Sequence, residues 1–178
     1  MNINELIKNR ESCRGYASTP VSLDQLKALV EVARLAPSAA NTQPWKFYVS
    51  NDPQVVGKIA EGCMPLGRNG FAASAPAFVV MTKGVETEPW VPKGPYNHYY
   101  RDFDCGSAAM HICFAATEMG LSTCMLGWFD GALVQQACGY GDDETATIVF
   151  TVGYAENDEL RPKTRNSLEE ILTVVGSL

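Results

Sequence analysis

Residues 36–45 read Ala-Pro-Ser-Ala-Ala-Asn-Thr-Gln-Pro-Trp and are the most informative segment of the sequence. They follow a helical pattern of apolar residues, and Pro37 is expected to end that helix. The small side chains that come next allow backbone N–H groups to approach a bound molecule. The amides of Asn41 and Gln43 both donate and accept hydrogen bonds, so they suit the polar edge of a heteroaromatic ring. The segment therefore predicts a ligand-binding loop.

Two basic segments lie at opposite ends of the sequence. Residues 10–14 read Arg-Glu-Ser-Cys-Arg, and residues 161–165 read Arg-Pro-Lys-Thr-Arg. No Lys or Arg occurs between Asp102 and Leu160. If the fold brings the ends together, the segments form two arms of one anion site; the alternative is two solvated surface clusters. Because guanidinium groups bind phosphate oxygens in pairs, a small phosphorylated ligand suits such a site.

Composition limits the class of protein. The chain has 178 residues, of which 46% are hydrophobic, and its 14 Lys and Arg against 20 Asp and Glu give a net charge of −6. One domain spanning residues 1–178 is expected. The acidic balance argues against nucleic acid as a partner. The longest uncharged stretch, residues 69–82, is shorter than the roughly 20 residues of a membrane helix, so no membrane association is expected.

The N-terminal residues and the cysteines indicate a cytoplasmic protein. Residues 1–16 contain five charged side chains and no apolar run, which argues against a signal peptide. Six cysteines occur without a CxxC pair and are expected to be reduced. Cys113 and Cys124 lie in apolar stretches, where a thiol acts as a small core side chain.

Periodicity predicts interspersed helices and strands, hence an α+β or α/β domain. Residues 84–97 are expected to form a loop. The long helix is predicted to present one face, Phe103, Gly106, Met110, Phe114 and Thr117, at intervals of three and four. Helices are predicted over residues 3–8, 22–36, 53–62, 97–120 and 131–138 and from 167 onward, and strands over 45–50, 77–82, 121–127 and 146–152.

Several common kinds of site are disfavoured. His98, Cys105, His111 and Cys113 share one helical stretch but do not converge as metal ligands must, so no metal is expected. The sequence contains no G-x-S-x-G nucleophile motif, P-loop or Rossmann glycine motif. A Cys–His dyad stays open, because such residues meet in space.

Together and in this order, the segments resemble the nitroreductase family of flavin mononucleotide (FMN) oxidoreductases. Residues 36–45 are similar to that family's [A]PSxxNxQPW segment, which is the most specific part of the match. The R-x-S-x-R of residues 10–14, the Lys-x-Arg of 163–165 and the Met-Leu-Gly-Trp-Phe-Asp of 125–130 occupy the expected places. The resemblance covers essentially the whole chain.

The resemblance implies an α+β fold with a mostly antiparallel central sheet flanked by helices. It also implies a homodimer with FMN at the interface, in which an arm of residues 154–178 reaches the partner subunit. The implied activity moves reducing equivalents from NADH or NADPH to a small organic acceptor, such as a nitroaromatic or a quinone, by a ping-pong mechanism. The alternative is a flavin-binding or flavin-remodelling protein without NAD(P)H turnover. The sequence does not select the acceptor or the nucleotide.

Site residues follow from the same resemblance. No catalytic side chain is implied, because the chemistry occurs at flavin N5, close to the backbone of Gly127 and Trp128. The loop 37–43 is implied to reach the flavin of the partner subunit, and the last two cations to clamp the phosphate. The implied cofactor-binding residues are Arg10, Glu11, Ser12, Arg14, Pro37, Ser38, Ala39, Asn41, Gln43, Asn69, Met125, Leu126, Gly127, Trp128, Lys163 and Arg165.

One departure and one further segment complete the prediction. Many family members place a lysine near flavin N1 in the region of residues 68–74, which here holds none, so Arg14 or Arg68 is left to supply positive charge. Residues 84–100 are the candidate substrate lid, although their aromatic side chains would equally suit a subunit interface. The candidate substrate residues are Trp90, Tyr96, Tyr99 and Tyr100.

Overall fold

The computed structural model describes residues 2–84, 100–157 and 159–176. The predicted substrate residues Trp90, Tyr96 and Tyr99 lie outside these ranges, and Tyr100 is the first residue of a helix. The helices are α1 (Ile3–Asn9), α2 (Leu23–Ala33), α3 (Pro53–Cys63), α4 (Tyr100–Glu118), α5 (Gly131–Cys138) and α6 (Leu168–Ile171). The strands are β1 (Trp45–Ser50), β2 (Ala77–Gly84), β3 (Ser122–Leu126) and β4 (Glu144–Gly153), and short 3-10 turns occur at η1 (Ala39–Asn41), η2 (Pro65–Gly67) and η3 (Gly70–Ser74).

The four strands form one sheet in the order β1-β2-β4-β3, and every neighbouring pair is antiparallel. The predicted α+β class and antiparallel sheet are therefore confirmed. The two central strands carry continuous apolar runs because both of their faces are covered. A bulge between Met81 and Thr82 shifts the β2–β4 register, and the Thr147 hydroxyl donates to the Met81 carbonyl at 3.1 Å.

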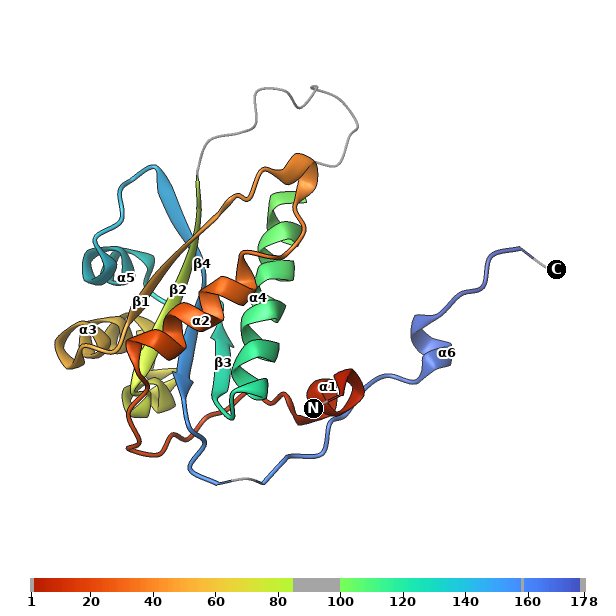
Figure 1. Ribbon diagram of the computed structural model, residues 1–178, viewed down its shortest axis with the longest axis horizontal. Helices are drawn as coiled ribbons and strands as arrows, with labels where there is room; N and C mark the ends of the chain where they lie inside the picture. The colour runs from red at the N-terminus through yellow and green to blue at the C-terminus, as the bar shows by residue number, and fades with distance from the viewer. Residues whose placement is uncertain (1, 85–99, 158, 177–178) are drawn as a thin grey trace.

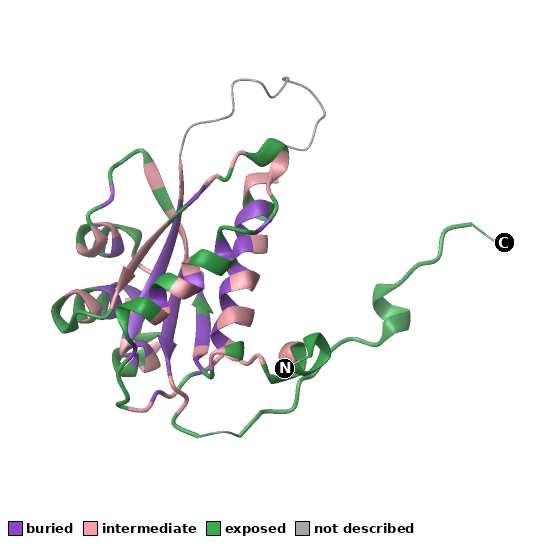
Figure 2. Cartoon of the chain, in the orientation of Figure 1, coloured by how far each residue is buried: buried purple, intermediate pink, exposed green. Residues whose placement is uncertain are grey.

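Helices cover the sheet on both faces (Figure 1). Because side chains alternate along a strand, Val79 and Met81 of β2 face the core formed with α2 and α4. Phe78 and Val80 face the core formed with α3 and α5. Figure 2 shows that burial is concentrated in the central strands and the inward side of α4.

Local signals account for where the helices begin. Asn2, Ser22 and Ser167 each form a capping box with the residue three positions later. The helix predicted to continue to Pro37 ends earlier, at Ala33. Proline disfavours helical geometry in the residue before it, and the chain here turns already at residues 34–36, where the Ala36 N–H donates to the Ala33 carbonyl at 3.1 Å.

The predicted face of the long helix is not the buried one. Phe103 is 68% exposed, and Met110 and Phe114 are only partly buried. The reason is the close approach of α4 to α2 and to the sheet, which only small side chains permit. The buried residues of α4 are Asp104, Cys105, Ala108, Ala109, Ile112, Cys113 and Ala116.

The segment after β4 leaves the sheet, passes α1 and continues to α6, which lies away from the rest of the domain (Figure 1). Its described residues from 159 to 176 are all exposed. They include the apolar side chains of Leu168, Ile171 and Val175, which are 62%, 67% and 93% exposed. None of the described helices combines the length and the apolar character needed to cross a membrane.

Candidate functional site

The N-terminal segment after α1 adds itself to the edge of the sheet. Ser12 forms a parallel bridge with Thr123 of β3, and the Cys13 N–H donates to the Thr123 carbonyl at 2.9 Å. The Tyr16 hydroxyl, 2.6 Å from Thr151 Oγ1, anchors the segment in the core. Burial raises the pKa of Tyr16, so the phenol stays neutral and keeps its proton for hydrogen bonding. Residues 10–16 are thus held at the start of β3.

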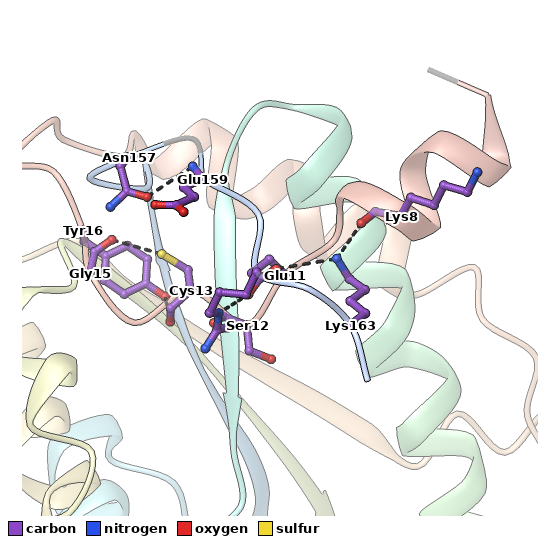
Figure 3. A network of polar contacts seen from close by, with 10 residues as sticks. Lys8, Glu11, Ser12, Cys13, Gly15, Tyr16, Asn157, Glu159 and Lys163 are labelled. Atoms are coloured by element: carbon purple, nitrogen blue, oxygen red, sulfur yellow. Dashed lines mark hydrogen bonds and ion pairs between the residues drawn. The ribbon is translucent and has the colours of Figure 1, made fainter. Parts of the chain in front are cut away.

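The two basic segments meet at this edge, as the uneven charge distribution predicts for one anion site. The Arg161 guanidinium pairs with the Glu11 carboxylate and also donates to the Ser12 carbonyl at 2.7 Å. The Lys163 ammonium donates to the Lys8 carbonyl at 2.6 Å and lies 3.6 Å from Glu11 Oε2 (Figure 3). Residues separated by about 150 positions therefore form one cluster.

Two cavities open beside the cluster. The one lined by the cations measures about 320 Å³, and its neighbour measures about 550 Å³. Glu11, Ser12 and Arg161 line both, so they form the wall between them. The smaller cavity is lined by Arg10, Glu11, Ser12, Arg161, Pro162, Lys163, Thr164 and Arg165.

The charged groups of the smaller cavity fit a phosphate. Within the described part of the chain, the Arg10 guanidinium makes no hydrogen bond or ion pair, and Arg165 binds only the neighbouring Thr164 carbonyl. Glu11 is the exception in this set, because a carboxylate offers no donor to a phosphate. Burial raises the pKa of Glu11, but Arg161 and Lys163 outweigh that effect and lower the pKa below its ordinary value. Glu11 is therefore ionised and bound to cations.

The other end of β3 carries the second part of the predicted site. Gly127 and Trp128 follow the strand and are exposed. The Asn69 side-chain amide donates to the Trp128 carbonyl and to the Cys63 carbonyl, both at 3.1 Å. Asn69, Gly127 and Trp128 thus lie together, about 13 Å along β3 from Thr123 at about 3.3 Å per residue.

The loop that contains residues 37–43 has an unusual backbone. Ala40, Asn41 and Gln43 have φ values of 49°, 56° and 47°, in the left-handed region. Hydrogen bonds hold it: Gln43 N–H donates to Ser38 Oγ at 3.0 Å, and the Ala39 N–H donates to Asp104 Oδ2 at 3.1 Å.

This loop and the basic cluster lie at different levels of α4. Asp104, which holds the loop, is in the second turn of the helix. Arg10 directly follows α1, which also contacts α4. Figure 1 likewise shows η1 beside the start of α4 and α1 beside its end. Within one chain, the loop and the basic cluster therefore lie apart along α4.

A comparison with models of protein families identifies the family to which the chain belongs. The model of the nitroreductase family matches residues 7–66 and 63–154. The chain belongs to the nitroreductase family.

Relatives and solved structures agree with that assignment. An NAD(P)H nitroreductase-like protein of Archaeoglobus fulgidus is 28% identical over 159 residues, covering 87% of this chain and 86% of that protein. An oxygen-insensitive NADPH nitroreductase of Helicobacter acinonychis is 27% identical, covering 73% and 76%. The fold is also similar to the crystal structure of an FMN- and NADPH-dependent nitroreductase from a sphigopyxis strain, with a TM-score of 0.81, 19% identity and coverage of 99% and 100%.

For a nitroreductase-family chain, one feature was not predicted from the sequence. Asp104 is a buried carboxylate that holds the 37–43 loop, and the signal for it was an acidic residue beside the small apolar residues of α4. Arg68, the alternative to the missing lysine, is exposed and directly precedes Asn69. It therefore lies at the Gly127 end of β3, whereas Arg14 lies at the Ser12 end.

Proposed function

We propose that this nitroreductase-family protein is an FMN-dependent oxidoreductase that transfers reducing equivalents from NADH or NADPH to a small organic acceptor. The observation that carries the proposal is the meeting of the two basic segments beside Ser12, at one end of a strand whose other end holds Gly127 and Trp128. Family membership and the NADPH-dependent relatives support it.

The proposed roles follow from donor chemistry. Arg10, Lys163 and Arg165 hold the phosphate, since guanidinium and ammonium groups pair with its oxygens. The Ser12 hydroxyl adds a neutral donor beside them. At the other end of β3, exposed backbone N–H groups of Gly127 and Trp128 face the reactive end of the ring system, and the Asn69 amide fixes their loop through the Trp128 carbonyl.

When bound, FMN supplies hydride transfer at N5, first from the nicotinamide and then to the acceptor. The chain's part is to hold the ring, leave one face open and offer positive charge from Arg14 or Arg68 near its pyrimidine edge. No side-chain base is required. Both substrates use the same open face in turn, which gives ping-pong kinetics; initial rates that fit only a sequential scheme contradict this.

The proposed assembly is a homodimer of single-domain chains, with no nucleic acid or membrane partner and a cytoplasmic location. The 37–43 loop of one copy completes the site of the other, because within one chain the loop lies beside the start of α4, whereas α1, which Arg10 follows, lies beside its end (Figure 1). The outward apolar side chains of α4 and the arm, residues 154–178, whose described residues from 159 to 176 are exposed, supply surface for the partner.

A visible absorption spectrum, recorded before and after anaerobic addition of NADPH or NADH, tests the proposal. A flavin spectrum that bleaches supports it. A flavin spectrum that persists with both nucleotides favours a flavin-binding or flavin-remodelling protein. A colourless protein that takes up no added FMN contradicts both.

A further inference from the structure

Among the described residues that line the smaller cavity, Glu11 is the one acidic side chain in a set of cations. A carboxylate there opposes the binding of an anion, so its presence needs a compensating role. Its side chain is only 18% exposed, and it lies between Arg161 and Lys163 of the C-terminal arm (Figure 3).

Both arm cations are fixed from two sides. Arg161 binds the Glu11 carboxylate and the Ser12 carbonyl, and Lys163 approaches the same carboxylate and binds the Lys8 carbonyl. Backbone carbonyls alone would hold the arm weakly, because each supplies a single neutral acceptor. The shared carboxylate joins the two cations to one point on the N-terminal segment, and charge-assisted bonds are the stronger ones.

We infer that Glu11 is a positioning residue: it latches the arm to the N-terminal segment of the same chain and so builds the anion site before any ligand binds. The latch neutralises part of the arm's charge, fixes Lys163 in the cavity wall and leaves Arg10 and Arg165 without a carboxylate partner among the described residues, so that all three cations face the anion. The inference depends on the proposed function only in the experiment that measures FMN binding. The contacts that form the latch are present in the chain without any ligand, so the digestion experiment tests them independently of that function.

Limited trypsin digestion reads the latch directly. Trypsin cleaves after Lys163 only when the Lys163 side chain can enter the enzyme's specificity pocket. In the latched chain the Lys163 ammonium is bound to Glu11 and to the Lys8 carbonyl, so cleavage is slowed. The full-length protein, as purified and after removal of its flavin, is digested and followed by mass spectrometry. In Glu11→Gln, cleavage after Lys163 relative to cleavage after Arg165 is expected to rise about fivefold. Glu156→Gln, which removes a carboxylate from the neighbouring cavity wall, is the matched control and should leave the ratio unchanged.

FMN titration measures how the loss of the latch changes ligand affinity at the site. At low salt, Glu11→Gln removes both the latch and a repulsive charge, and the two effects partly cancel. At about 1 M salt, where the Debye length is about 3 Å, the repulsion across the open cavity is screened more strongly than the direct, half-buried contact between Glu11 and Arg161, so the lost latch dominates. The dissociation constant for FMN is then expected to rise about fivefold. Glu11→Asp, which restores the carboxylate on a shorter side chain, should recover part of the loss.

The outcomes separate the two proposals. An unchanged digestion ratio in Glu11→Gln, or tighter FMN binding at both salt concentrations, overturns the latch. A raised digestion ratio in a chain that binds no FMN supports the latch and contradicts the proposed function. A raised ratio together with weaker FMN binding at high salt supports both.

Discussion

Gly153 occupies a position at the end of β4 where a larger residue has no room. A Cβ atom there would lie 2.7 Å from Pro76 Cδ and 2.7 Å from Tyr16 Cδ1. Both neighbours are ring atoms in the wall that holds the N-terminal segment against the sheet, so neither moves easily. The absence of a side chain is what allows the site segment to pack here.

Gly153→Ala is therefore expected to destabilise the fold by about 1–3 kcal/mol through overpacking. Urea denaturation measures the change. Gly57→Ala is the control, because a Cβ there meets nothing within 4 Å on α3. That variant should gain about 0.5–1 kcal/mol of stability, since alanine favours a helix interior. Equal effects at the two positions would contradict the packing argument.

Glu144 is a second residue whose environment determines its contribution. Its side chain is 7% exposed and accepts hydrogen bonds from Thr82 at 2.6 Å and from Tyr48 at 3.0 Å, and it pairs with Lys46. Burial raises the pKa of Glu144, but these donors outweigh burial and leave the pKa below its ordinary value. The ionised form is thus the one that stabilises the folded sheet.

Because the folded pKa is lowered, this contribution is present above the unfolded pKa of about 4.3 and is lost as the pH falls through the folded pKa. Glu144→Gln is expected to lower stability by about 2 kcal/mol at neutral pH, and the gap should close on acidification. Denaturant titrations over that pH range check this. Lys46→Gln removes a partner that is 66% exposed and should matter less, by about 0.5 kcal/mol.

Among the elements, the same capping box occurs in two helices with different packing. Ser22 caps α2, whose Leu26 and Leu29 are fully buried against α4 and the sheet. Ser167 caps α6, which buries no side chain within the described chain. Both caps make the same pair of hydrogen bonds, at 3.1 Å to Ser22 Oγ and 3.4 Å to Ser167 Oγ, but only α2 packs against the core.

Ser22→Ala is expected to reduce the free energy of unfolding by about 1 kcal/mol. Ser167→Ala, the matched variant, should leave domain unfolding unchanged, because α6 can lose its structure without opening the core. Thermal or urea unfolding of both variants, with Ser22→Asp as a rescue, makes the comparison. A loss of equal size for Ser167→Ala would mean that α6 packs on the domain after all.

The positions of helices could be predicted well from the sequence where a capping residue determines the start of the helix. Asp52 and Asp130 cap α3 and α5, and both helices were predicted at nearly their observed bounds. The prediction of which face of α4 is buried was wrong, because hydrophobic periodicity assigns the largest apolar side chains to the core. Close helix packing instead buries the small ones and leaves Phe103 outside.

At the scale of the whole molecule, the proposed role of the C-terminal arm can be tested by deleting it. Deletion of residues 160–178 removes Arg161, Lys163 and Arg165, and the described part of that segment is exposed throughout. The truncated chain is expected to keep its fold, to lose flavin and to form a weaker dimer. Absorbance ratios, circular dichroism and analytical ultracentrifugation test the three points. A truncated protein that stays yellow and dimeric refutes the arm's proposed role.

The charge distribution left two alternatives for the basic segments, one shared anion site or two solvated clusters, and the contacts of Arg161 and Lys163 with residues 8–12 decide for the first. The partners of Glu11 and Asp104 could not be predicted, since each contact joins residues far apart in the sequence. A carboxylate's role depends on which cation or N–H group the fold delivers to it. Sequence patterns describe local geometry and carry little of that information.

The spacing between the 37–43 loop and Arg10 along α4 has a genetic consequence under the proposed assembly. Each binding site then takes its parts from two copies, and a dimer has two such sites. A copy damaged in Asn41 and a copy damaged in Arg10 are each inactive alone. Mixed in one dimer, they place both defects in one site and leave the other site intact, so two inactive alleles restore up to half of the activity per mixed dimer.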